Sequence, residues 1–462
     1  MKNDTIAAIS TAVSPSGIGI IRISGEEALR IADRIYRSPG GKKKLSAQQT
    51  HTIHYGYIMD GEDVVDEVLV SVMRAPKTFT AEDTVEINCH GGVYAMKRVL
   101  ETVLKNGARP AQAGEFTKRA FLNGRMDLSR AEAVIDIIQA KNEYALKSSV
   151  SQLKGSVQKR IKKLREEILY ETAYVESALD DPEHISLDGF SGEIGEKNRR
   201  WMGELNRLIA SADNGKIITE GIRTVILGKP NAGKSSLLNL LLGEERAIVT
   251  DVAGTTRDTL EENVNINGLT LRLIDTAGIR RTKDLVEQIG VERAKETAQT
   301  ADLIIYVVDA SVPLDENDRQ IMELIRGKKT LVLLNKSDLE TVVEKEDIQA
   351  ILGDSRAAAI LTISAREQTD AREIENTIQE LFFHGELSFN DEVYITNTRQ
   401  KAELVEAFES LAQLKNSLDM EMPEDFYTID LMNAYEALGR ITGESVEEDL
   451  VNEIFGRFCM GK

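Results

Sequence analysis

The sequence predicts a multidomain protein of mixed α/β and α class, in which one α/β domain interrupts a helical region. Three patterns lead to this prediction. The first 120 or so residues mix short apolar runs with turns, residues from about 128 repeat apolar side chains every three or four positions, and the middle of the chain alternates β-rich runs with helical stretches. The 462 residues suggest roughly three domains at about 150 residues each.

Residues 1–122 are expected to form an α+β domain. Ile20, Ile21 and Ile23 follow a glycine-rich turn, and two further apolar runs occupy 68–73 and 84–88. Short apolar and β-branched runs bounded by turn residues are typical of strands.

Two helical segments, 123–220 and 384–462, flank the middle domain. Six apolar residues are spaced by three or four positions and are expected on one face of a single helix: Val150, Leu153, Val157, Ile161, Leu164 and Ile168. The helical pattern pauses at Asp180, Asp181 and Pro182. We interpret the segments as halves of one split helical domain, with two separate helical domains as the alternative.

Residues 221–383 are expected to form a parallel sheet covered by helices, because β-rich runs alternate there with helical stretches. The runs are Val225–Leu227, Leu271–Ile274, Leu303–Val308, Leu331–Leu334 and Ile360–Ile363.

The sequence GKPNAGKS at 228–235 matches the phosphate-loop pattern GxxxxGK[ST]. An apolar strand precedes it and an apolar helix follows it, as such a loop requires. Glycines let backbone N–H groups turn onto phosphate oxygens, and the helix N-terminus adds its positive dipole end. Lys234 is expected to reach the β- and γ-phosphates, and Ser235 to ligate Mg²⁺.

Four further features follow in the order of a Ras-like P-loop G domain. Asp275 can hold the Mg²⁺ shell through water, and the Gly278 N–H can sense the γ-phosphate. Thr255 and Thr256 lie where a switch loop is expected, with Thr256 as the better Mg²⁺ ligand.

The remaining two features select the base. Asp338, in the sequence Asn335-Lys336-Ser337-Asp338, can accept hydrogen bonds from guanine N1–H and the N2 amino group. Adenine offers neither donor, and a buried carboxylate left unpaired is costly. Ser364 and Ala365 complete the base pocket, so the sequence predicts that GTP, and not ATP, is bound and hydrolysed.

The residue that would orient the attacking water is less evident. Ras-like enzymes use a glutamine after the DxxG glycine, but Ile279 stands there. Glu287 is the candidate, and a solvated carboxylate at a helix start is the competing interpretation. Asn231 could ligate a monovalent cation beside the phosphates, or be an ordinary loop residue.

Composition limits the setting. A net charge of −19 weakens general attraction to nucleic acid and anionic membranes, so RNA contact requires a local basic patch or a partner protein. No stretch reaches the ~18 apolar residues of a membrane span, and the start lacks signal-peptide blocks. Cys89 and Cys459 cannot form a disulfide framework, so a reducing, cytoplasmic location is expected.

Four motifs together resemble the MnmE (TrmE) family of tRNA-modification GTPases. They are GKPNAGKSS, TDVAGTTRD at 250–258, DTAGIR at 275–280 and the terminal FCMGK at 458–462. The resemblance covers the full chain. It implies an N-terminal folate-binding and dimerisation domain at 1–122, a split helical domain, an inserted G domain, and a homodimer whose G domains pair when GTP and K⁺ are bound.

The resemblance also assigns the nucleotide and metal ligands. K⁺ is expected on Asn231, Thr250, Val252 and Thr255, Mg²⁺ on Ser235 and Thr256, and the attacking water on Glu287. The implied GTP-binding residues are Asn231, Ala232, Gly233, Lys234, Ser235, Ser236, Thr250, Asp251, Val252, Ala253, Gly254, Thr255, Thr256, Asp275, Thr276, Ala277, Gly278, Asn335, Lys336, Asp338, Ser364 and Ala365.

For the N-terminal domain the resemblance implies a 5-formyltetrahydrofolate-type cofactor, bound by Arg22, Glu86, Arg125 and Lys462. Basic groups can pair with the folate carboxylates, and Glu86 can accept from pterin N–H groups. Without the resemblance, each would be an ordinary surface charge. Cys459 is implied as a nucleophile or acid/base group, where the sequence alone indicates a small apolar residue.

By this resemblance the protein is a K⁺-dependent GTP hydrolase. With the FAD-dependent partner MnmG it would add a carboxymethylaminomethyl or aminomethyl group to carbon 5 of the wobble uridine of certain tRNAs. The competing hypothesis is a regulatory or ribosome-assembly switch GTPase that performs no modification.

Overall fold

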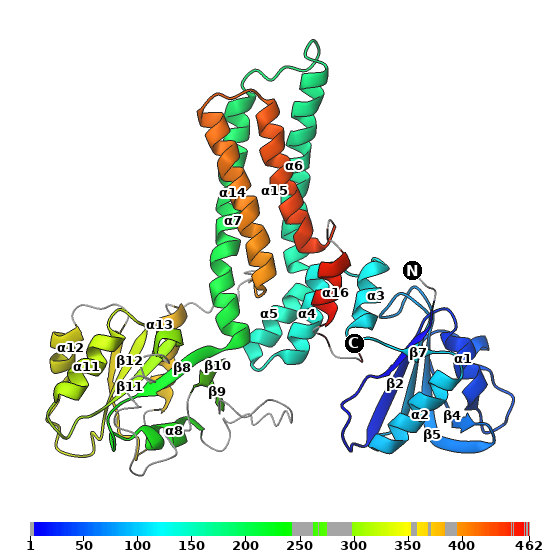
Figure 1. Ribbon diagram of the computed structural model, residues 1–462, viewed down its shortest axis with the longest axis horizontal. Helices are drawn as coiled ribbons and strands as arrows, with labels where there is room; N and C mark the ends of the chain where they lie inside the picture. Colours follow the sequence, from blue (N-terminus) through cyan, green and yellow to red (C-terminus); the bar gives the residue numbers. More distant parts are fainter. Residues whose placement is uncertain are drawn as a thin grey trace. The chain divides into compact units, whose positions relative to one another are not determined.

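The chain divides into two compact units in a computed structural model (Figure 1). One unit holds Met1–Ile135, Gln152–Gly195 and Glu409–Lys462, and the other holds Asp136–Ser151 and Glu196–Phe408. The structure describes residues 4–242, 262–266, 268–274, 298–352, 358–367, 371–383, 395–444, 446, 448–456, 458 and 461.

The first unit contains a seven-stranded sheet in the order β3-β4-β5-β6-β2-β1-β7. Its strands are β1 (Ile6–Ile9), β2 (Ile18–Ser24), β3 (Tyr36–Arg37), β4 (Thr52–Asp60), β5 (Asp63–Met73), β6 (Thr84–His90) and β7 (Arg109–Pro110). Helices α1 (Ala28–Ile35) and α2 (Val93–Lys105) share one buried core with the sheet. The three predicted apolar runs are strands β2, β5 and β6, which confirms the α+β prediction.

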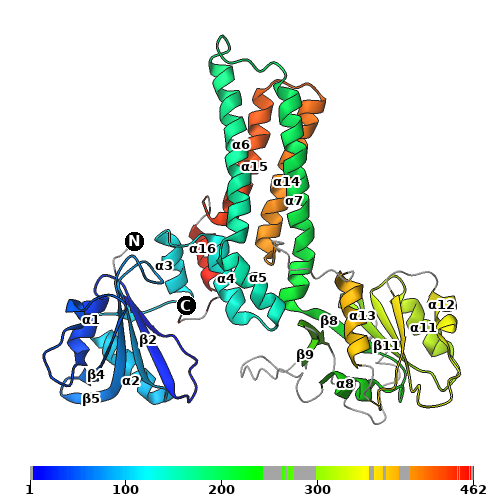
Figure 2. The same cartoon turned by 180° about the vertical axis from the view of Figure 1, so that it is seen from behind.

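Helices from both sides of the middle domain pack together in this unit (Figure 2). Arg165 of α6 (Ser156–Asp180) donates from Nε to the Tyr435 carbonyl at 3.2 Å and lies 4.1 Å over the Tyr435 ring, on α15 (Asp425–Thr442). Its guanidinium also pairs with Glu444. The helical region is therefore one split domain, and the alternative of two separate helical domains is wrong.

Smaller helices complete this unit. They are α3 (Glu115–Leu122), α4 (Leu128–Gln139), whose last residues belong to the second unit, and α16 (Glu448–Gly456). Ala120, Leu128, Phe455 and Phe458 share one buried cluster. Phe455 and Phe458 are thus anchored on α3 and α4.

The single helix expected over 150–168 is wrong. Helix α5 (Glu143–Leu153) ends before α6 begins, and Gly155 between them has a left-handed φ of 85°. Glycine adopts that conformation without a steric penalty. Apolar spacing alone does not register such a break, because it continues across it.

The second unit contains a six-stranded sheet in the order β13-β12-β11-β8-β10-β9. Its strands are β8 (Ile222–Leu227), β9 (Glu262–Ile266), β10 (Leu269–Leu273), β11 (Leu303–Asp309), β12 (Thr330–Asn335) and β13 (Ala358–Thr362). All neighbours are parallel except β9, which is antiparallel to β10. The parallel sheet is confirmed. Strand β9 was not predicted because two of its five residues are asparagines, which are rare in strands.

Helices cover both faces of this sheet. Residues of α8 (Lys234–Leu242) and α13 (Ala371–Phe383) join one buried cluster of sheet residues. Residues of α11 (Glu316–Ile325) and α12 (Lys345–Leu352) join another. Helices α7 (Phe190–Glu220) and α14 (Thr398–Asp419) each have residues in both units.

A short segment at the start of α5 packs on the sheet of the second unit. The Asn142 side chain donates to the Ile218 carbonyl at 2.9 Å and to Thr270 Oγ1 at 3.1 Å, and accepts from Ala145 N at 2.7 Å. A Cβ on Gly268 would lie 2.7 Å from the Tyr144 ring. This segment therefore contacts the β9–β10 hairpin directly. The domain limits drawn from the sequence remain predictions.

In the described part of the chain, every helix is too short or too polar to span a bilayer.

Candidate functional sites

The phosphate loop joins the buried strand β8 to helix α8. Gly228 has a φ of 150°, and a Cβ there would lie 2.4 Å from the Val307 carbonyl oxygen. Gly233 has a φ of 103°, and its Cβ would lie 2.0 Å from Asn335 Nδ2. Only glycine fits either position, so the motif glycines are required by close approach of the chain as well as by conformation.

Lys234 lies inside this loop. Its ammonium donates to the carbonyls of Gly228 and Lys229, both at 2.6 Å. Burial lowers the pKa of the amine, because the charged form loses water. Two neutral carbonyls are weak partners for a cation, so an anionic phosphate placed beside the loop would be a stronger one.

The start of the loop and of its helix offers the other expected ligands. Asn231 is exposed with a φ of 62°, a left-handed conformation that asparagine tolerates better than most residues. Ala232 is buried, and Ser235 and Ser236 are exposed at the first turn of α8.

Asn335 connects the phosphate loop to the expected base pocket. Its buried side chain donates to the Ala232 carbonyl at 2.8 Å and accepts from Ala365 N at 3.0 Å. Ser364 Oγ donates to Asp338 Oδ1 at 2.9 Å. The structure thus brings together Asn335, Asp338, Ser364 and Ala365 at the carboxyl edge of β12 and β13. Lys336, with a φ of 70°, pairs with Asp309 beside them.

Lys229, at a variable position of the motif, has a role that the motif does not predict. Its ammonium lies 2.6 Å from Asp318 Oδ2 and 3.0 Å from Asp315 Oδ2. Asp318 is 1% exposed and also accepts from the Tyr306 hydroxyl at 2.7 Å. Lys229 therefore ties the phosphate loop to the first turn of α11. No sequence signal identifies this contact, because it joins residues about ninety positions apart.

The other predicted residues of the nucleotide, catalytic and folate sets lie outside the described residues. They are Thr250, Asp251, Val252, Ala253, Gly254, Thr255, Thr256, Asp275, Thr276, Ala277, Gly278, Glu287, Cys459 and Lys462.

A second cluster of predicted residues occupies the sheet of the first unit. Arg22 on β2 and Glu86 on β6 are direct neighbours across the two strands. Arg22 Nε donates to Glu86 Oε1 at 2.8 Å, and Nη1 donates to the Gly461 carbonyl at 3.3 Å. The penultimate residue of the chain is thereby held against this ion pair.

Aromatic rings hold the guanidinium groups of the cluster. Arg22 lies 5.5 Å from the Phe79 ring centre and 5.6 Å from that of Phe116, and Arg125 lies 5.0 Å from Phe79. Burial and the nearby charge of Arg130 lower the pKa of Arg125. The structure thus gathers Arg22, Glu86 and Arg125 around Phe79. The two phenylalanines were missed because no motif marks them.

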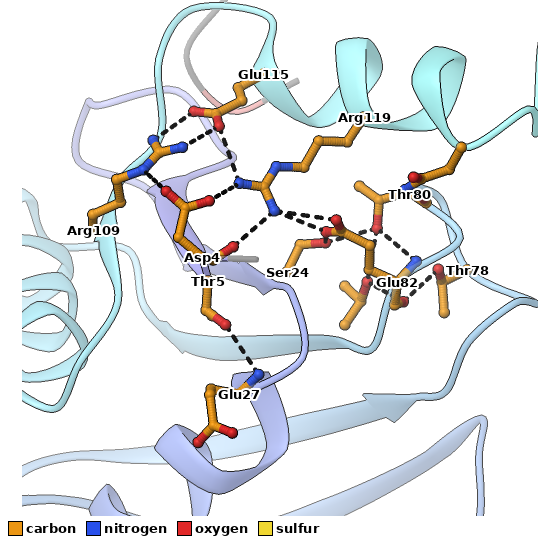
Figure 3. A network of polar contacts seen from close by, with 12 residues as sticks. Asp4, Thr5, Ser24, Glu27, Thr78, Thr80, Glu82, Arg109, Glu115 and Arg119 are labelled. Atoms are coloured by element: carbon orange, nitrogen blue, oxygen red, sulfur yellow. Dashed lines mark hydrogen bonds and ion pairs between the residues drawn. The ribbon is translucent and has the colours of Figure 1, made fainter. Parts of the chain in front are cut away.

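An ion-pair network holds α3, which carries Phe116 (Figure 3). Arg119 donates to Asp4 Oδ1 at 2.8 Å, to Glu115 Oε1 at 3.1 Å and to Glu82 Oε1 at 3.1 Å. Arg109 pairs with Asp4 and Glu115 from the other side.

The pKa values of two carboxyl groups in the network are held below their usual range. Burial acts to raise the pKa of Glu115, but hydrogen bonds from Arg109, Gln112 N and Arg119 outweigh it and hold the pKa below its usual value. Hydrogen bonds from Arg109 and Arg119 lower the pKa of Asp4 despite some burial. Both groups therefore stay charged and keep the network intact near neutral pH.

Comparison with known proteins identifies the chain's relatives. A family model described as the MnmE helical domain matches residues 128–459, and one described as the N-terminus of the GTP-binding protein TrmE matches residues 5–125. The protein named tRNA modification GTPase MnmE from Lachnoclostridium phytofermentans is 59% identical over 462 residues, which is 100% of both chains. The proteins of the same name from Alkaliphilus oremlandii and Enterococcus faecalis are 49% and 48% identical, over 100% of this chain and 99% of each relative. Because the identity extends over the full length, the chain belongs to the MnmE family of tRNA modification GTPases.

Proposed function

We propose that GTP hydrolysis by this enzyme drives, together with an FAD-dependent partner protein, the attachment of a carboxymethylaminomethyl or aminomethyl group to carbon 5 of the wobble uridine of certain tRNAs. The observation that carries the proposal is the junction at Asn335. One buried amide links the phosphate loop to the residues that would recognise guanine, so triphosphate and base are gripped by one connected structure.

The hydrolytic part depends on both metal ions. Ser235 and Thr256 would hold Mg²⁺, and Asn231, Thr250, Val252 and Thr255 would hold K⁺, which supplies positive charge where negative charge develops. The exposed, left-handed Asn231 supports this assignment, since its amide carbonyl is available at the surface of the loop. Glu287 would orient the attacking water.

The one-carbon part belongs to the N-terminal domain. A 5-formyltetrahydrofolate-type folate would bind at Arg22, Glu86, Arg125 and Lys462. The fit is chemical: guanidinium groups suit the folate carboxylates, and the Phe79 ring suits a flat pterin. Arg22 already neutralises Glu86, which leaves Arg125 as the better partner for a carboxylate. Cys459 would act as nucleophile or proton donor.

The proposal places the enzyme in the cytoplasm as a homodimer that works with its FAD-dependent partner on tRNA. Mass spectrometry of tRNA nucleosides from cells that lack the gene tests it. We expect the modified wobble uridine to disappear, to return with the wild-type gene, and to stay absent with Lys234→Ala. Normal nucleosides together with accumulated ribosomal precursors would instead establish a ribosome-assembly switch.

A further inference from the structure

Lys154 and the first two turns of α6 carry a positively charged surface that the nucleotide and folate sites do not use. We call it the α6 basic face; its exposed residues are Lys154, Lys159, Arg160, Lys162 and Lys163. The chain has 76 acidic and 57 basic residues, yet between Glu143 and Glu166 it has seven basic residues and no acidic one. Positive charge is therefore concentrated in this segment, although the protein as a whole is negatively charged.

The helix presents these bases to solvent. Val157, Ile161, Leu164 and Ile168 are buried, and Lys159, Lys162 and Lys163 fall on the opposite side of a helix with 3.6 residues per turn. Figure 2 shows α6 beside α15, the partner of its buried side.

Lys159 and Arg160 directly follow the first turn of α6, near the end of a helix that tolerates positive charge least. The N-terminus of a helix is the positive end of its dipole and favours acids, but α6 has none in its first turn. Like charges three and four residues apart, as at 159, 162 and 163, also destabilise the helix. An anion bound here would relieve both penalties.

Among the described residues, the ion pairs of this face do not extend to Lys159 or Lys163. Lys162 lies 3.8 Å from Glu166, where the basic face ends. In the part of the chain that the structure describes, Lys159 and Lys163 form no ion pair. Exposed Lys415, by contrast, pairs with Asp419 at 2.7 Å, four residues on.

Two arginines connect this surface to the cluster around Phe79. Arg130 Nε donates to the Leu153 carbonyl at 2.9 Å, directly before Lys154, and its Cδ lies 3.9 Å from a Cβ built on Gly155. Arg130 in turn repels the charge of Arg125, which stands over Phe79. Arg125 and Arg130 thus lie between the candidate one-carbon site and the start of α6.

We propose that the α6 basic face binds the phosphate backbone of the tRNA substrate while the nucleotide to be modified lies at the cluster around Phe79. This inference rests on the proposed function and adds the docking surface to it. RNA is favoured as the occupant because its charge is continuous along a chain, like that of the surface. Because phosphate contacts carry no base sequence, the surface would serve several tRNAs alike. The negative remainder of the protein repels RNA and so orients it onto this face.

Fluorescence anisotropy with a tRNA transcript that has uridine at the wobble position tests the proposal on the full-length protein. In the double variant Lys159→Gln with Lys163→Gln, the slope of log affinity against log salt concentration should be less steep by roughly 1.4. That is about 0.7 for each lost phosphate contact. Affinity near 0.1 M salt should fall roughly 25-fold if the two plots meet near 1 M. Lys159→Arg with Lys163→Arg should keep the wild-type slope, and Lys415→Gln is the matched control.

Thermal unfolding followed by circular dichroism verifies that each variant folds. Equal tRNA affinity and salt slope in the wild type and the glutamine variant would overturn the surface and leave the proposed function standing. Wild-type protein that turns over GTP but binds no tRNA at any salt would also overturn the surface, because the partner protein would then supply the RNA contact. If the glutamine variant lost binding to vesicles rich in phosphatidylserine but kept its tRNA affinity, the proposal of an RNA surface would be overturned. The α6 basic face would then be a membrane-binding surface.

Discussion

The two candidate sites are held in opposite ways. At the cluster around Phe79, each arginine already has a carboxylate, carbonyl or ring as partner, and a network of ion pairs fixes α3 behind it. At the phosphate loop, the partners of Lys234 among the described residues are two carbonyls of its own loop. The cluster around Phe79 is therefore stabilised without a ligand, whereas the Lys234 ammonium at the phosphate loop still lacks an anionic partner among the described residues. The difference predicts that mutations affect folding in one unit and nucleotide affinity in the other.

The largest effect should come from Lys234→Ala. Removing the ammonium deletes charge-assisted hydrogen bonds to phosphate, and GTP affinity should fall about a thousandfold, or about 4 kcal/mol. Isothermal titration calorimetry measures this loss. Exposed Lys345→Ala is the control and should bind as the wild type does. A GTP affinity of Lys234→Ala within tenfold of the wild-type value would contradict the contrast between the sites.

Arg119→Met should act on stability instead. It leaves Glu115 and Glu82 partly buried without their shared cation, at a cost of about 3 kcal/mol. Hydrogen exchange of peptides from α3 reports the local opening free energy. Arg30→Met is the matched control, because Arg30 is exposed and pairs with exposed Glu27; its loss should stay below about 1 kcal/mol. Equal losses in both variants would mean that burial of the network contributes nothing.

Asp338→Asn should change base preference without unfolding the domain. An amide cannot accept from both guanine donors but can donate to the C2 carbonyl of xanthine. We expect about 100-fold weaker binding of GTP and tighter binding of xanthosine triphosphate, in line with the discrimination that buried polar groups provide. Competition with a fluorescent nucleotide measures both affinities. An unchanged ratio would remove Asp338 from the base pocket.

The smallest expected effect is the loss of stability of α3 at low pH. The pKa values of Asp4 and Glu115 are lowered in the folded protein, so their contribution to stability is complete above the ordinary carboxyl pKa of about 4 and is lost as pH falls through the lowered values. Exchange protection of α3 should decline below about pH 4 in the wild type. The decline should be shallower in Arg119→Met. Parallel declines would show that other carboxyl groups control acid sensitivity.

Sequence patterns predicted what is local in the chain. The phosphate loop, the strands around it and the segment with Asn335 and Asp338 are short motifs, each placed by a neighbouring strand. The connections between them are not local. Asn335 meets Ala232 across 103 positions, and Arg22 meets Glu86 across 64. Lys229, Phe79 and Phe116 acquire their roles only when distant elements pack, so spacing along the chain holds no signal for them.

Asn142 has a consequence for how force passes through the second unit. The hairpin that it grips joins the chain's two expected nucleotide-sensing stretches, since β9 follows the sequence TDVAGTTRD and β10 leads into DTAGIR. Hydrogen bonds tolerate displacements of only a few tenths of an ångström before they weaken. A nucleotide-driven shift of the hairpin must therefore either break the Asn142 contacts or pull residues 136–151 along, and with them the end of α4.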